Sequence, residues 1–198
     1  MGYYVEKPFR IPATARSFEG FRRWTRSSRF PEQGRIDYIG GHIEVDMSPE
    51  DLHKHGLVKT TIAGVLFDRI MLRELGDVYI DRARVAVPGP KLSVEPDVVV
   101  VLWESIDSGR VREIPRKIKR PESYIELEGS VDLVVEVISD SSVGKDRTLL
   151  PPQYAAAGVP ELWLVDVRRG LRFEVHVLEG EGYRLLAADA DGWLRSPL

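Results

Sequence analysis

The stretch 131–139, VDLVVEVIS, decides the fold of this chain. Its apolar and β-branched residues run on without alternation, which is typical of a strand covered on both faces. Glu136 interrupts this run, and a carboxylate inside an apolar strand needs a partner. The stretch therefore predicts both a central strand and a site built on it.

Two further strands and a helix surround this stretch in the sequence. The run 98–102, VVVVL, follows Pro96-Asp97, and the run 161–167, ELWLVDV, follows a helical segment at 146–157. Gly158 is a suitable C-terminal stop for that helix. This order predicts an α/β (α+β) fold with a mixed central β-sheet flanked by helices.

The remaining segments add an N-terminal helix and hairpins. Gly40-Gly41 divides two alternating runs in 35–47, which predicts a β-hairpin. Ser48 as N-cap, Pro49 at the first position and Asp51 at the third predict a helix that continues to about Leu75. The other expectations are a short helix with an arginine-rich outer face at 17–27, strands at 78–80 and 84–87, a long loop at 103–129, and a last hairpin at 173–178 and 182–186.

Composition limits the class of protein. With 198 residues, 43% of them hydrophobic, one domain is expected over 1–198, with an N-terminal extension at 1–34 and a core at about 35–186. There is no cysteine, which excludes disulfides and thiolate metal sites. No signal peptide or membrane span is recognisable, so a cytoplasmic protein is expected.

The distribution of charge neither indicates nor excludes nucleic-acid binding. The formal net charge of −3 does not indicate phosphate binding, which depends on clustered lysine and arginine. Taken alone, the two basic stretches are better explained as solvated faces or mobile loops, and they point to nucleic acid only beside a catalytic site. These stretches comprise Arg16, Arg22, Arg23, Arg26 and Arg29 near the start, and Arg110, Arg112, Arg116, Lys117, Lys119 and Arg120 in the middle.

Asp97 and Glu136 are the candidate metal ligands. Each stands on or beside a predicted buried strand, and two carboxylates on adjacent strands suit a hard cation such as Mg²⁺ or Mn²⁺. The backbone carbonyl of Val137 is the natural third ligand from the protein. Such an ion can polarise a phosphate and lower the pKa of an attacking water, which is the chemistry of phosphodiester hydrolysis.

Five pieces of the sequence occur in a recognisable order between about Arg35 and Asp166. They are Met47-Ser48-Pro49 with His55, then Glu95-Pro96-Asp97, then 132–139, then Asp146-Arg147, and finally 154–166, YAAAGVPELWLVD. Together they resemble the Uma-two family of restriction endonuclease-like proteins. The resemblance implies the PD-(D/E)XK nuclease fold, with Asp97 and Glu136 as metal ligands and nucleic acid, DNA above all, as substrate.

The active-site lysine of that superfamily is absent from both of its usual positions in this sequence. Position 138 is isoleucine, and position 150, to which the family commonly moves the lysine, is leucine. Lys145 is the nearby candidate to orient water or to stabilise charge on the phosphate, although a lysine before a helix is often solvent-exposed and structural.

Several other side chains have either a functional or a structural explanation. His55 matches a helical histidine that faces the site in the family, and His53 competes with it for that role. Glu44, with Asp46 on the same hairpin, would add a carboxylate to the metal site, although a solvated strand face explains it equally well. Tyr154 and Trp163 are expected to be core aromatics.

Three functions remain open on the sequence alone. The first is a metal-dependent endonuclease, for which a homodimer would suit the cutting of two strands. The second is a catalytically degenerate nuclease fold that binds nucleic acid or a partner. The third is a different hydrolase that uses a hard metal, because a carboxylate pair does not name a substrate.

Overall fold

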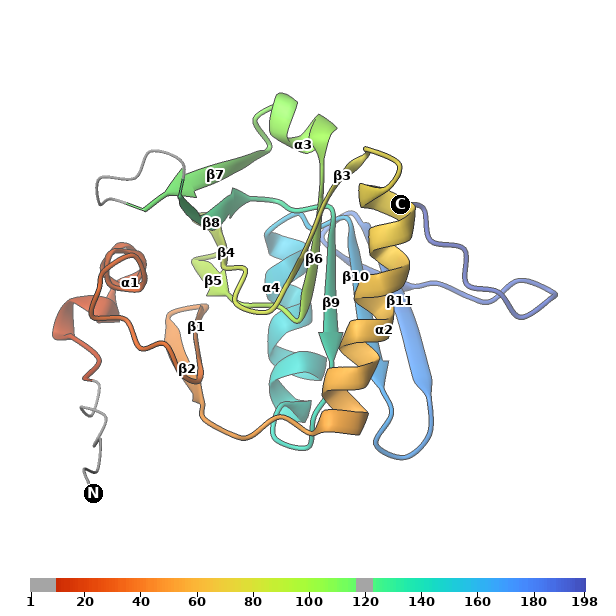
Figure 1. Cartoon of the computed structure of the whole chain (residues 1–198), viewed down its shortest axis with the longest axis horizontal. Helices are drawn as coiled ribbons and strands as arrows, with labels where there is room; N and C mark the ends of the chain where they lie inside the picture. Colours follow the sequence, from red (N-terminus) through yellow and green to blue (C-terminus); the bar gives the residue numbers. More distant parts are fainter. Residues whose placement is uncertain (1–9, 117–122) are drawn as a thin grey trace, which may run out of the picture.

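The computed structural model describes residues 10–116 and 123–198, which form two mixed six-stranded sheets instead of the single central sheet expected (Figure 1). The first sheet contains, in spatial order, β2 (His42–Asp46), β1 (Arg35–Ile39), β5 (Leu92–Val94), β4 (Val85–Val87), β8 (Tyr124–Gly129) and β7 (Val111–Pro115). The second contains β12 (Gly182–Leu185), β11 (Arg172–Glu179), β10 (Glu161–Asp166), β9 (Leu133–Val137), β6 (Val98–Leu102) and β3 (Gly76–Ile80).

Helical segments cover these sheets. Residues Leu52–Gly56 (η2), Leu57–Leu66 (α2) and Phe67–Met71 (η3) follow one another as one helical stretch, and so do Lys145–Leu149 (η4) and Leu150–Ala156 (α4). The others are η1 (Ala13–Arg16), α1 (Phe18–Thr25) and α3 (Trp103–Asp107). Within the described residues, no helix is long and apolar enough to cross a membrane.

The central strands β6, β9 and β10 of the second sheet are buried on both faces, as the unbroken apolar runs predicted. Ile62 and Leu66 of α2 pack with Val135 and Val137 on one face of the sheet. On the other face, Tyr154 of α4 belongs to the core that also contains residues of the first sheet. In Figure 1, α2 and α4 accordingly lie on opposite sides of β9 and β10. Glu136 is in β9, between these two layers.

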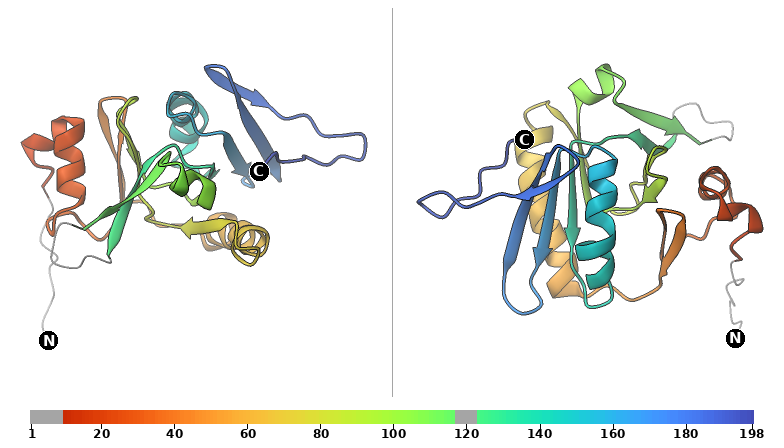
Figure 2. Two further views of the ribbon diagram at one scale, coloured as in Figure 1. Left: turned by 90° about the horizontal axis from the view of Figure 1, so that it is seen from above. Right: turned by 180° about the vertical axis from the view of Figure 1, so that it is seen from behind.

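Helix α1 fixes the hairpin of β1 and β2. Ser17 caps the helix by accepting a hydrogen bond from the Gly20 amide at 3.2 Å. Phe21 is fully buried, and its ring lies 5.4 Å from that of Tyr38 on β1. Figure 2 shows α1 against this hairpin, on the side away from α2. Packing on this face leaves Arg35 and Asp37 of β1 on the opposite face, because side chains alternate along a strand.

Three sequence expectations were wrong in detail. Asp51, and not Ser48, caps the long helix formed by η2, α2 and η3. The Asp51 carboxylate accepts hydrogen bonds from the amides of His53 and Lys54 at 2.9 and 2.7 Å. That helix ends at Met71, before the expected Leu75. The segment 103–129 contains α3, β7 and β8 where a long loop was expected, and the short strand β5 was not foreseen.

Phe21→Ala should lower the free energy of unfolding by about 3–5 kcal/mol, because a fully buried aromatic side chain leaves a cavity between α1 and β1. Urea denaturation followed by circular dichroism measures this change. Leu171→Ala is the control: Leu171 is 75% exposed, so its truncation should change stability by no more than about 0.5 kcal/mol. Equal effects of the two substitutions would contradict the packing described here.

Candidate functional site

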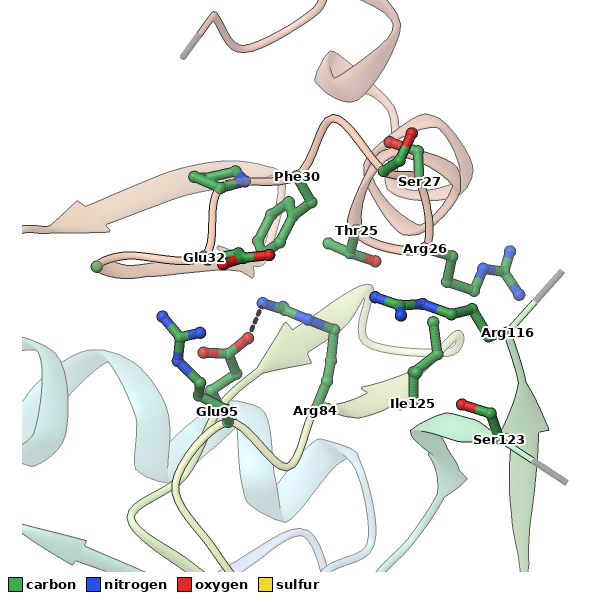
Figure 3. A pocket seen from close by; sticks show the side chains of 14 residues that line it. Thr25, Arg26, Ser27, Phe30, Glu32, Arg84, Glu95, Arg116, Ser123 and Ile125 are labelled. Carbon is green, nitrogen blue, oxygen red and sulfur yellow. Dashed lines mark hydrogen bonds and ion pairs between the residues drawn. The ribbon is translucent and has the colours of Figure 1, made fainter. Parts of the chain in front are cut away.

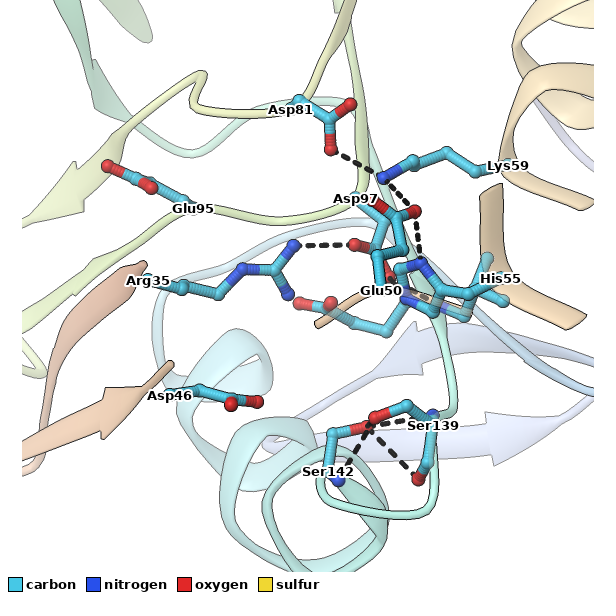
Figure 4. A network of polar contacts seen from close by, with 12 residues as sticks. Arg35, Asp46, Glu50, His55, Lys59, Asp81, Glu95, Asp97, Ser139 and Ser142 are labelled. Atoms are coloured by element: carbon cyan, nitrogen blue, oxygen red, sulfur yellow. Dashed lines mark hydrogen bonds and ion pairs between the residues drawn. The ribbon is translucent and has the colours of Figure 1, made fainter. Parts of the chain in front are cut away.

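The carboxylate of Asp97 lies at the centre of the site, directly before β6, and is 1% exposed. Its Oδ1 accepts a hydrogen bond from Arg35 Nη2 at 2.7 Å, and its Oδ2 accepts one from the Val137 amide at 2.7 Å. His55 Nε2 lies 3.2 Å from the same Oδ2. Figure 4 shows Arg35 and His55 approaching Asp97 from different sides. The first sheet, the long helix and β9 therefore meet at one side chain.

Charge keeps Asp97 ionised in spite of its burial. Burial raises the pKa of Asp97, but the hydrogen bond from His55 and the charge of Arg35 outweigh this and hold that pKa below its usual range. Burial lowers the pKa of His55, yet Asp97 and Glu50 together raise it to about 9. His55 is therefore a cation at neutral pH, and its Nδ1 lies 2.6 Å from Glu50 Oε1.

The pKa of Glu136 is shifted in the opposite direction from that of Asp97. Its side chain is 1% exposed; Oε1 accepts a hydrogen bond from the Tyr154 hydroxyl at 2.6 Å, while Oε2 has no partner. Burial, followed by the charges of Asp146 and Asp97, raises the pKa of Glu136 to about 8. Tyr154 is fully buried, as expected for a core aromatic, and it also orients this carboxylate.

Lys145 belongs to the same group of charged side chains, called the cluster below, which comprises Arg35, Asp37, His55, Asp97, Glu136, Lys145 and Asp146. Its Nζ lies 3.3 Å from Asp37 Oδ2 and 3.9 Å from Asp146 Oδ1. Burial lowers the pKa of Lys145, but the charges of Asp37 and Glu136 outweigh this and raise it, so the amine stays protonated. Burial raises the pKa of Asp146 to about 6 against the opposing charge of Lys145. A lysine is thus present beside the carboxylates although positions 138 and 150 lack one.

The other candidates from the sequence divide clearly. His55 is in the site, whereas its competitor His53 is exposed. Glu44 is exposed opposite Asp37 on the hairpin, and it makes no hydrogen bond or ion pair with any described residue. Ile138 and Leu150, at the two usual lysine positions, are each 1% exposed and belong to the apolar core.

The arginines of the N-terminal helix do not all face solvent, contrary to expectation. Arg22 is buried and pairs with Glu126 and Glu128 of β8, each at 2.5 Å. It is therefore committed to joining α1 to the first sheet. Of the second basic stretch, Lys117, Lys119 and Arg120 lie outside the described residues.

Sequence reasoning missed several residues of the cluster, of which Arg35 is the most important. The register pairs Arg35 with Asp46 and Asp37 with Glu44 across the hairpin, so four charged residues share one face. This alternation of charged and apolar residues was the available signal. Lys59 was also missed; its Nζ lies 2.6 Å from Asp81 Oδ1 and 2.7 Å from Glu50 Oε1.

Solvent reaches the cluster through two cavities. One, of about 350 Å³, is lined by Arg35, Glu50, His55 and Asp81. The other, of about 250 Å³, is lined by Arg35, Asp37, Glu44 and Lys145. The cavities therefore open on Arg35, Asp37, His55 and Lys145, whereas Asp97 and Glu136 line neither cavity and are each 1% exposed.

The donors of the cluster fit a hard cation. Glu136 Oε2 and Asp146 Oδ1 are buried oxygens without a hydrogen-bond partner, and burial with the nearby charges of Asp146 and Asp97 raises the pKa of Glu136. Among the described residues, no three or more Asp, Glu, His or Cys side chains are arranged to hold a metal by themselves. A magnesium ion that keeps several waters needs fewer protein ligands than that.

Glu136→Gln should change the pH dependence of folding in the presence of EDTA. The pKa of Glu136 is about 8 in the folded protein against an ordinary 4.5, so this group favours folding fully below pH 4.5 and loses that contribution as pH rises through 8. Relative to wild type, Glu136→Gln should therefore gain stability from pH 5 to pH 8, by about 1 kcal/mol or more. Urea denaturation at several pH values measures this gain.

The exposed Glu44→Gln is the matched control, and its stability should follow wild type at every pH. A Glu136→Gln curve parallel to wild type would contradict the raised pKa of Glu136.

Comparison with a solved structure supports the fold. A protein from Anabaena variabilis ATCC 29413, described as a "putative nuclease belonging to DUF820", superposes with a TM-score of 0.61 at 17% identity. The match covers 85% of this chain and 83% of that chain. Among curated proteins, none matches this chain.

Comparison with family models gives the relationship of the whole sequence. The model of the Uma2 family, described as "Putative restriction endonuclease", matches residues 18–198. This range includes both sheets, the cluster around Asp97 and every candidate ligand considered above. The chain belongs to the Uma2 family of restriction endonuclease-like proteins, as its sequence motifs predicted.

Proposed function

We propose that this protein is a metal-dependent endonuclease that hydrolyses phosphodiester bonds in DNA. The observation that carries the proposal is Glu136 Oε2, a buried carboxylate oxygen without a partner beside the ionised Asp97. A purely structural strand has no use for such a group, since a buried polar atom without a hydrogen-bond partner destabilises the fold. Membership of the Uma2 family supports the same class of reaction.

Glu136, Asp97 and the backbone carbonyl of Val137 would hold Mg²⁺ or Mn²⁺. Asp97 Oδ1 accepts one hydrogen bond, from Arg35, and so retains a lone pair for a cation. When bound, the ion would polarise the phosphate and lower the pKa of an attacking water.

The protein's own cations would complete the site. Lys145 is protonated and faces the same cluster, so it can donate hydrogen bonds to a phosphate oxygen on which negative charge develops. Arg35 and His55 fix the orientation of Asp97 through its two oxygens. Glu44 would act at the rim, through solvent, because its side chain is exposed.

A binding module without catalysis is the second candidate, and the positions of Ile138 and Leu150 favour it. Both side chains are buried in the apolar core, so neither of the usual lysine positions supplies a charge. In this case Lys145 would only neutralise Asp37 and Asp146. Metal binding combined with cleavage separates the endonuclease from this alternative. The homodimer and the cytoplasmic location stay predictions.

Glu136→Gln and Asp97→Ala should each abolish Mn²⁺ binding measured by calorimetry and cleavage of plasmid DNA. The first variant replaces the carboxylate by an amide of the same size, so its loss of binding does not arise from a cavity. Asp107→Ala removes a carboxylate at an exposed position of α3 and should behave like wild type. Mn²⁺ binding by Glu136→Gln equal to wild type would exclude Glu136 as a ligand, and binding without cleavage by wild type would favour the binding module.

Lys145→Met should lower kcat for cleavage by roughly 10²–10³-fold while Mn²⁺ binding is retained, because Lys145 is proposed to act on the phosphate and not on the ion. Lys54→Met, at an exposed position of η2, is the matched control and should leave kcat unchanged. Unaltered cleavage by Lys145→Met would show that this lysine is structural.

A further inference from the structure

A third and larger cavity adjoins the site. Its volume is about 530 Å³, and it lies between the segment that joins α1 to β1 and the first sheet (Figure 3). Gly34, Arg82 and Glu95 line both this cavity and the one that opens over His55. Glu95 is two residues before Asp97 in the chain. The large cavity therefore continues directly from the carboxylate cluster.

Four arginines give this cavity its chemistry, against two glutamates. Arg84 is buried and paired with Glu95 at 2.5 Å, and Arg26 lies 3.9 Å from Glu126. Arg82 and Arg116 are exposed, and neither side chain pairs with any described residue. The hydroxyls of Thr25 and Ser27 donate to the carbonyls of Arg22 and Trp24, whereas the Ser123 hydroxyl has no partner among the described residues. Two uncommitted guanidinium groups and the Ser123 hydroxyl suit a phosphate group.

The backbone holds Arg82 in a strained conformation at the boundary between the two cavities. Asp81 and Arg82 have φ angles of 46° and 52°, in the left-handed region that residues other than glycine rarely occupy. The Asp81 amide donates to the Asp97 carbonyl at 3.2 Å, and the Asp81 carboxylate pairs with Lys59 at 2.6 Å. Such strain persists only where surrounding contacts impose it, and it is common at functional sites.

The aromatic ring of Phe30, which lines the cavity, already contacts two other side chains. Phe30 lies 4.9 Å from the ring of Trp24, and the Arg84 guanidinium lies 5.2 Å from the Phe30 centroid. Stacking on a nucleobase is therefore not the main source of affinity here. Phosphate contacts carry no sequence information, so binding in this cavity would be independent of base sequence.

We propose that this cavity binds one nucleotide of an unpaired nucleic-acid strand, with its phosphate contacted by Arg82 and Arg116. The proposal rests on the proposed endonuclease function, because the nucleotide would adjoin the phosphodiester bond at Asp97 and Glu136. The volume suits a single small ligand. Positively charged recesses that follow the backbone are typical of proteins that bind single strands.

The test is fluorescence anisotropy with a fluorescein-labelled oligothymidylate of twelve nucleotides, in EDTA so that no cleavage occurs. Arg82→Ala and Arg116→Ala should each weaken binding roughly ten-fold, which is typical for loss of one hydrogen bond to a charged group. Each should also reduce the slope of log K against log salt by about 0.7. Arg73→Ala removes the same charge from an exposed position after η3 and should bind like wild type.

Three results would overturn the proposal. The first is no binding by wild type, and the second is equal binding by the Arg82, Arg116 and Arg73 variants. The third is a duplex of equal length that binds as tightly and depends equally on Arg82 and Arg116. These outcomes are distinct from failure of the proposed function. Binding is measured in EDTA and without cleavage, so loss of cleavage by Glu136→Gln concerns the metal site and not the cavity.

Discussion

The carboxylate of Asp97 is the group on which the arrangement of the site depends. Its hydrogen bonds come from Arg35 on the first sheet and from the Val137 amide on the second, and His55 approaches it from the long helix. Removing this carboxylate would leave a half-buried guanidinium and a buried imidazolium without their main partner, which is costly. One side chain therefore joins three parts of the chain and is itself kept ionised.

Glu136 shows why this cluster is more than an interior ion-pair network. The cations of the site are directed at Asp97 and Asp37, while Glu136 receives one hydrogen bond from Tyr154 and none on Oε2. Its pKa is consequently raised while that of Asp97 is lowered. Two neighbouring carboxylates with opposite shifts are a common mark of functional sites, and a divalent cation would remove the imbalance.

The sequence predicted the central elements well because their signals are local. Unbroken apolar runs identified β6, β9 and β10, and a charged residue inside such a run identified Glu136. The edges were harder: β7 has mostly exposed residues and β5 has three residues, so neither shows the periodicity of a buried strand. Arg35 and Lys145 depend on tertiary packing. Only the seating of α1 on β1 turns Arg35 towards Asp97, and only the placement of η4 brings Lys145 to Asp37.

The metal site can be tested with a crystal structure grown with Mn²⁺, through the anomalous scattering of the ion. We expect one strong peak bonded to Glu136 Oε2 and to a carboxylate oxygen of Asp97, at about 2.2 Å from each. A map without a peak there, with Glu136 Oε2 still unpaired and Arg35 still on Asp97, would contradict the assignment of these two carboxylates as a metal site.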